Sequence, residues 1–168
     1  MNADPRQEWL NDAIARWEKP LLRLCFSYLC DTALAEDAVQ ETFFKAWKNY
    51  GCFRGEAGEK TWLMRIAVNT CKDYRRTAWF RHIDRKQSLE ELPPQLLSVE
   101  PKDETLTLLV MELPDRYKQV ILLYYFQGLT MQETADALGS SQPSVQRRLK
   151  QAEALLKTSL TGGEAYEG

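Results

Sequence analysis

Apolar positions recur with helical spacing along most of the chain. In residues 142–157 an apolar stripe runs at intervals of three and four residues, formed by Val145, Leu149, Ala152 and Leu156. In residues 36–50 a second apolar face is formed by Val39, Phe43, Ala46, Trp47 and Tyr50. This spacing gathers side chains on one side of an α-helix, whereas a half-buried strand would alternate. The pattern therefore predicts an all-α protein.

The outer surface of the 36–50 helix is predicted to be polar, with one aromatic exception. Its members are Asp37, Gln40, Glu41, Phe44, Lys45 and Lys48. Gly51 and Gly55 then end the helix. After this loop, Thr61 is expected to cap a further helix, whose inward positions are Leu63, Ile66, Ala67, Thr70 and Tyr74.

The opposite side of that further helix carries a basic and polar stripe. Arg65, Asn69, Lys72 and Arg76 recur at helical intervals and point toward a cluster formed by Arg75, Trp79, Phe80 and Arg81. Aromatic faces stack unpaired bases at about 1–3 kcal/mol each, and cations follow the backbone of a single strand. The stripe therefore favours binding of single-stranded nucleic acid. The alternative is that the aromatic rings pack against the domain and the charges are simply solvated.

Residues 129–157 predict two short helices joined by a tight turn. Thr130 and Glu133 form a capping box that starts the first helix. Ala135 keeps that helix surface small for a close crossing, and Gly139 supplies the left-handed backbone that a sharp exit needs. Ser141 or Gln142 can cap the second helix, and Pro143 suits its first turn. Together these features predict a helix-turn-helix.

The outer face of the second helix is basic and polar. Arg147 lies opposite the apolar stripe, with Lys150 and Gln151 beside it and Gln146 at the edge. Arg and Gln side chains can bond base edges in the major groove, whereas Lys150 and Arg148 are suited to phosphates. The segment therefore favours duplex DNA reading over the alternative of a solvated helix in an all-α core.

Charge divides the chain into blocks, although its net charge is only −2. Residues 45–86 hold eleven Lys or Arg and four Asp or Glu, which makes this block basic. Residues 87–115 hold one Lys and seven Asp or Glu, which makes this block acidic. Pro93, Pro94 and Pro101 interrupt the acidic block. We therefore expect a helical domain at 1–86, an acidic flexible linker at 87–104 and a helix-turn-helix domain at 105–160, followed by a flexible glycine-rich tail at 161–168.

Composition argues against several classes of protein. The chain is 44% hydrophobic and 27% charged, as is ordinary for a folded soluble protein. It has a single histidine and its four cysteines lack C-x-x-C spacing, so no metal site, cofactor or catalytic residue is expected, and the thiols are predicted to be reduced and buried. Neither a signal peptide nor an apolar run of membrane-spanning length is visible, which predicts a cytoplasmic protein without membrane insertion.

Three segments resemble the extracytoplasmic-function class of bacterial sigma factors, in the sigma-70 family. The match to its promoter-melting domain is DAVQETFFKAWKNYGCFRGEAGEKTWLMRIAVNTCKDYRR at 37–76, preceded by WEKPLLRLCFSYLCD at 17–31. The match to its minus-35-reading domain is LPDRYKQVILLYYFQGLTMQETADALGSSQPSVQRRLKQAEALLK at 113–157. The short linker is also similar, because this class lacks the intermediate domain of larger sigma factors.

The resemblance implies three binding surfaces and no enzymatic activity. Core RNA polymerase would be bound by Asp37, Gln40, Glu41 and Phe44. The minus-ten element would be bound by Arg65, Asn69, Lys72, Arg75, Arg76, Trp79, Phe80 and Arg81, with Asn69 beside the pocket for a flipped base. The minus-35 element would be bound by Ser144, Gln146, Arg147, Arg148, Lys150 and Gln151. The class also implies an anti-sigma factor as a partner, and a linker that enters the RNA channel of the polymerase.

The chain departs from the family pattern in the second helix of the helix-turn-helix. A Pro-x-Gly-Thr-Val run is replaced by residues 141–145, SQPSV, and an Arg-Ala-Arg run by residues 151–153, QAE. The minus-35 contacts should therefore be less basic than usual, while Val145, Leu149 and Leu155 are expected to preserve the core. A self-sufficient dimeric helix-turn-helix repressor or activator, which reads a palindrome, is the alternative from another class. A further alternative is an enzyme, although the sequence has a single histidine and shows neither a phosphate-binding glycine loop nor a metal-ligand cluster.

Overall fold

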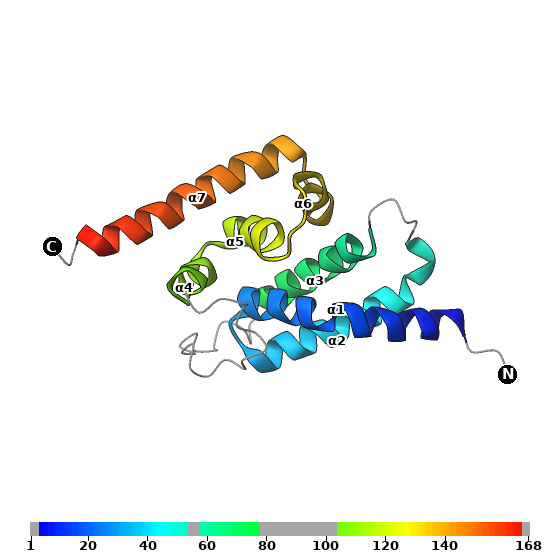
Figure 1. The fold of residues 1–168 in the computed structure, drawn as a ribbon. Coiled ribbons are helices and arrows are strands. Elements are labelled where there is room, and N and C mark those ends of the chain that lie inside the picture. The colour runs from blue at the N-terminus through cyan, green and yellow to red at the C-terminus, as the bar shows by residue number, and fades with distance from the viewer. Residues whose placement is uncertain (1–3, 54–57, 78–103, 166–168) are drawn as a thin grey trace. The chain divides into compact units, whose positions relative to one another are not determined.

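The computed structural model describes residues 4–53, 58–77 and 104–165, and all regular elements within these ranges are helical (Figure 1). The predicted all-α class is therefore confirmed. The chain divides into two compact units, residues 1–98 and 99–168, and each is described by itself. Trp79, Phe80 and Arg81 and the predicted linker up to residue 103 lie outside the described residues.

The first unit is built from three helices that pack against one another, α1 (Pro5–Leu29), α2 (Thr32–Lys48) and α3 (Glu59–Arg76), with a short 3-10 turn, η1 (Tyr50–Cys52), after α2 (Figure 1). Asp4 and Asp31 cap α1 and α2 by accepting bonds from the backbone N–H groups of Arg6 and Leu34. The fully buried core includes Leu21, Leu24, Ala38, Leu63, Met64 and Ala67. Each of the three helices contributes to it, so the two outward surfaces of α2 and α3 are held on a common core.

The start of α3 differs from the sequence prediction. The helix begins at Glu59, two residues before the expected cap, and Gly58 occupies the N-cap position. Its carbonyl oxygen accepts from the backbone N–H of Trp62 at 3.0 Å. Thr61 is buried within the first turn, so its prediction as the cap is wrong. The expected inward set is otherwise partly confirmed, since Leu63, Ala67 and Thr70 are buried while Ile66 and Tyr74 are half-buried.

Glu59 fastens the start of α3 to α1. Its Oε1 accepts from the indole N–H of Trp9 at 2.7 Å, and its Oε2 accepts from the indole N–H of Trp17 at 3.0 Å. The Trp9 ring also lies near Trp62, with ring centroids 6.0 Å apart. Hydrogen bonds to an ionised, partly buried group are stronger than bonds between neutral groups. One carboxylate therefore ties two turns of α1 to the beginning of α3.

We expect Glu59→Ala to lower the free energy of unfolding of the first unit by about 1.5 kcal/mol, because two part-buried indole N–H groups lose their acceptor. All five tryptophans lie in this unit, so tryptophan fluorescence in a urea titration reports its unfolding. Glu59→Gln keeps one carbonyl acceptor and should lose less stability. Equal midpoints for wild type and Glu59→Ala would show that the two bonds contribute nothing.

The second unit contains α4 (Glu104–Glu112), α5 (Asp115–Ile121), a π-helical turn, η5 (Leu122–Phe126), α6 (Met131–Leu138) and α7 (Gln142–Ala165) (Figure 1). α7 packs along α4, α5 and α6. Its predicted apolar stripe is confirmed, because Val145, Leu149, Ala152 and Leu156 are all buried. The outer face of α7 therefore has a fixed orientation relative to the rest of this unit.

The turn between α6 and α7 has the predicted local geometry. Thr130 and Glu133 form the capping box in both directions. Gly139 ends α6 with φ of 63°, in the left-handed region, and Ala135 is 1% exposed. The Ser141 hydroxyl accepts from the backbone N–H of Ser144 at 3.3 Å, which identifies Ser141 as the cap of α7. The predicted helix-turn-helix is thus present.

Several local predictions are wrong. Helix α7 continues to Ala165, so the helix includes residues 161–165 of the segment predicted as a tail. Leu155 is 42% exposed rather than part of the core, because it lies about 100° around the helix from Leu156. The cysteines are free, but Cys52 is exposed and Cys30 half-buried, so only Cys25 and Cys71 fit the predicted burial.

Candidate functional site

The outer surface of α2 presents one large aromatic side chain among polar groups. Asp37, Gln40 and Phe44 are exposed, and Glu41 is half-buried. Phe44 is 56% exposed, and the Nζ of Lys48 lies 5.3 Å from the centroid of its ring. Residues at these intervals share one side of a helix. An exposed aromatic ring surrounded by polar groups is typical of a protein-binding surface.

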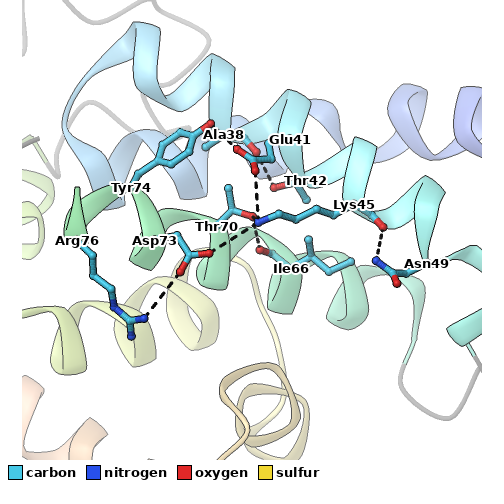
Figure 2. Close-up of polar contacts among 10 residues, drawn as sticks. All are labelled: Ala38, Glu41, Thr42, Lys45, Asn49, Ile66, Thr70, Asp73, Tyr74 and Arg76. Carbon is cyan, nitrogen blue, oxygen red and sulfur yellow. Dashed lines mark hydrogen bonds and ion pairs between the residues drawn. The ribbon is translucent and has the colours of Figure 1, made fainter. Parts of the chain in front are cut away.

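Glu41 is bonded to α3 as well as facing outward. The Tyr74 hydroxyl donates to Glu41 Oε2 at 2.8 Å, and the Lys45 Nζ lies 3.6 Å from Glu41 Oε1. Figure 2 shows both side chains directed toward this carboxylate. Burial is the main cause, and the bond to this carboxylate the second, that raises the pKa of Tyr74 well above its usual range. The hydroxyl therefore stays protonated and remains a donor. Glu41 is therefore held in a defined position.

Lys45 extends this contact across the α2–α3 junction (Figure 2). Its Nζ donates to Thr70 Oγ1 at 3.1 Å and lies 3.9 Å from Asp73 Oδ2. The other oxygen of this carboxylate, Oδ1, lies 3.9 Å from Arg76 Nη1. Such partly exposed ion pairs each contribute little to stability. Their effect is positional, because they link the outer side of α2 to the polar side of α3. Sequence analysis placed Lys45 on the outer surface without its partners.

The polar stripe of α3 is present in the structure. Arg65, Asn69 and Arg76 are exposed and Lys72 is half-buried. Arg75 differs from them, because its guanidinium donates to the Tyr28 carbonyl oxygen at 3.1 Å and lies 5.7 Å from the centroid of the Tyr28 ring. Arg75 thus helps hold α3 against α1. The aromatic cluster predicted beyond α3 lies outside the described residues.

The predicted DNA-facing residues of α7 lie together on its outer side. Gln146, Arg147, Lys150 and Gln151 are exposed, and Ser144 and Arg148 are half-buried. This face is opposite the buried stripe, so packing of the stripe fixes its direction. Arginine and glutamine supply donors for base edges, and the nearby cations suit phosphates. The arrangement can bind duplex DNA in the manner of a recognition helix.

A contact missed by the sequence analysis joins α7 to the π-helical turn. The Tyr125 hydroxyl donates to Glu153 Oε1 at 2.5 Å. This bond, with a smaller effect of burial, raises the pKa of Tyr125 to about 12. The two residues are 28 positions apart in the sequence, so helical spacing does not pair them. The contact gives the Glu153 carboxylate a specific partner at the edge of the DNA-facing side.

The described residues contain no group of three or more His, Cys, Asp or Glu side chains that could hold a metal ion. Among the same residues, none of the helices is both long and apolar enough to cross a membrane. The chemistry that the exposed surfaces offer is hydrogen bonding, ion pairing and aromatic contact.

Comparison with known proteins agrees with this geometry. Residues 13–81 match the family described as Sigma-70 region 2, and residues 103–156 match Sigma-70, region 4. RNA polymerase sigma factor YlaC of Bacillus subtilis is 32% identical over 165 residues, which cover 94% of this chain and 95% of that protein. RNA polymerase sigma factor SigV of the same organism is 32% identical, with 83% of each chain covered.

Solved structures show the same fold. CnrH, in complex with the cytosolic domain of CnrY, is 25% identical with a TM-score of 0.70, covering 93% of this chain and 90% of that one. The sigma factor RpoE of Bartonella quintana, in complex with the anti-sigma factor NepR, is 22% identical with a TM-score of 0.71, covering 92% and 98%. The two family matches together span most of the described chain, and the two relatives named above, which are aligned over most of their own length, are sigma factors. The chain therefore belongs to the sigma-70 family of RNA polymerase sigma factors, in the extracytoplasmic-function class, whose members are not enzymes.

Proposed function

We propose that this sigma factor binds core RNA polymerase through α2, reads the minus-ten element with α3 and the minus-35 element with α7, and promotes melting of promoter DNA. The observation that carries the proposal is that each compact unit presents outward binding residues. The first unit presents the Phe44 surface of α2 (Asp37, Gln40, Glu41 and Phe44) and the polar stripe of α3, and the second presents the basic face of α7. Polymerase performs the chemistry, and the sigma factor supplies position and sequence preference.

The polymerase-binding surface comprises Asp37, Gln40, Glu41 and Phe44. Phe44 is the apolar anchor, and the acidic groups on the same side favour a basic partner surface. The bonds from Tyr74 and Lys45 orient Glu41 before binding. A carboxylate that is already positioned loses less side-chain entropy when it meets its partner.

The minus-ten surface comprises Arg65, Asn69, Lys72, Arg75, Arg76, Trp79, Phe80 and Arg81. Asn69 is exposed midway along α3 and can bond the edge of an extruded base, while Arg65 and Lys72 follow the strand. Extruding a base costs a few kcal/mol, which base contacts and phosphate contacts can offset. Because Arg75 also bonds Tyr28, we assign it mainly to shaping this surface.

The minus-35 surface comprises Ser144, Gln146, Arg147, Arg148, Lys150 and Gln151. Arg147 is central on the exposed side of α7, so we assign it to base reading, and Arg148 at the half-buried edge to a phosphate. The domains are proposed to span 1–86 and 105–160, with the acidic segment 87–104 entering the RNA channel of the polymerase.

Regulation is proposed to involve an anti-sigma factor in the cytoplasm. CnrH and RpoE are each described in complex with a second protein, which is named as an anti-sigma factor for RpoE. The exposed Phe44 surface offers a site that such a protein could cover. Binding there would compete with core polymerase.

The test is reconstitution of transcription from purified components. Promoters are first selected from genomic fragments by core polymerase loaded with this protein. We expect the protein alone to bind these promoters weakly, and the loaded polymerase to initiate at defined sites where permanganate detects unpaired thymines. Core polymerase alone is the control. Tight binding to a palindrome without polymerase, together with no initiation, would instead support the dimeric repressor or activator.

A further inference from the structure

Glu153 is an acidic residue on a helix that is otherwise suited to DNA. It is exposed on α7 and accepts a hydrogen bond of 2.5 Å from the Tyr125 hydroxyl. Tyr125 belongs to the π-helical turn Leu122–Phe126, where the neighbouring Leu122 and Leu123 are buried and anchor the turn. The tyrosine itself is 56% exposed and contacts Tyr124 edge to face, with centroids 5.0 Å apart. An anchored turn therefore presents the hydroxyl that holds the carboxylate.

The position of Glu153 along α7 places it beside two lysines. Lys150 precedes it by three residues and Lys157 follows it by four, and both are exposed. Side chains at these intervals are neighbours on a helix surface, and a glutamate four residues before a lysine is the favourable order for an ion pair. If it were released from Tyr125, the carboxylate could pair with either lysine. The bond to Tyr125 competes with that pairing.

The charge of Glu153 opposes DNA binding. Lysines on this edge of α7 would meet phosphates, and a carboxylate among them repels the same phosphates. We infer that Glu153 lowers the affinity of α7 for the minus-35 element, an inference that rests on the proposed function of α7. Tyr125 is then a positioning residue, which holds the carboxylate away from Lys150 and Lys157. The promoter contact is thereby weakened by one charge while both lysines stay available. Strong promoter binding then depends on polymerase and on the second promoter element.

The experiment uses polymerase loaded with the full chain and a selected promoter duplex that ends between the minus-35 and minus-ten elements. We expect Glu153→Gln to tighten binding about threefold at low salt. The slope of log affinity against log salt concentration should become steeper by up to about one, which corresponds to one more released counterion. Tyr125→Phe should weaken binding about threefold, because the freed carboxylate neutralises a lysine. In the Glu153→Gln background, Tyr125→Phe should have no further effect.

Matched variants separate this inference from simpler explanations. Glu112→Gln makes the same change of charge on the exposed side of α4, and Tyr124→Phe removes the adjacent hydroxyl; neither should change affinity. The inference is overturned if Glu153→Gln behaves like Glu112→Gln, or if Tyr125→Phe weakens binding equally in both backgrounds. Arg147→Ala distinguishes the two proposals: if it weakens binding while Glu153→Gln changes nothing, only the inference fails. If Arg147→Ala also changes nothing, the proposed minus-35 role of α7 fails with it.

Discussion

Phe44→Ala is expected to weaken binding of core RNA polymerase about 100-fold, or roughly 2.7 kcal/mol. Phe44 is 56% exposed in the free protein, on the side of α2 that carries Asp37 and Gln40. Large aromatic side chains that become fully buried at the centre of an interface contribute disproportionately to affinity. An exposed ring in the free protein contributes little to the fold, so its removal should leave stability nearly unchanged.

The size of this effect can be separated from misfolding by graded variants. Phe44→Leu keeps an apolar side chain of similar reach and should lose much less affinity than Phe44→Ala. Glu18→Gln changes an exposed residue of α1, outside the proposed surface, and should bind as wild type does. Affinity is measured by titrating labelled protein with core polymerase, and circular dichroism checks the helical content. Unchanged affinity of Phe44→Ala would remove this residue from the polymerase-binding surface.

The helices could be predicted because their determinants are local. The stripe on α7 depends on a spacing of three and four residues, and its buried members are those that the spacing selects. The α6–α7 turn follows from a capping box and from a left-handed glycine, which few other residue types replace at Gly139. Local chemistry therefore specified both the elements and the face that α7 turns outward.

The contacts that position the surfaces could not be predicted in this way. Tyr74 and Glu41 are 33 residues apart, and Trp9 and Glu59 are 50 residues apart. Periodicity assigns each residue to a side of its own helix, but it does not give the rotation of one helix against another. That rotation depends on side-chain packing in the core.

The start of α3 shows how a distant contact overrides a local preference. Threonine is a better N-cap than most residues, which made Thr61 the natural choice. In the structure Glu59 bonds two α1 tryptophans, and the helix includes it. Burial of Thr61 then uses that side chain for packing instead. The same limit applies to Arg75, whose bond to Tyr28 is not visible in a charge pattern.

Arg147→Ala is expected to lower affinity for the minus-35 duplex by about 2 kcal/mol, roughly 30-fold, and to remove preference at one base pair. Arg147 is exposed on the side of α7 opposite Val145 and Leu149, which are buried. A guanidinium in the major groove can bond one base by two donors, and alanine supplies neither. The measurement is selection of a library randomised across the minus-35 element, read position by position.

Arg148→Ala is the matched control, because it removes the same charge from the adjacent, half-buried position. If Arg148 contacts a phosphate, its loss should weaken all sequences alike and flatten the salt dependence, while the selected sequence stays the same. Arg147→Ala should change the selected sequence as well as the affinity. If both variants lowered affinity without changing any base preference, α7 would contact only the phosphate backbone of the duplex. The sequence preference of this sigma factor would then have to come from the surface of α3.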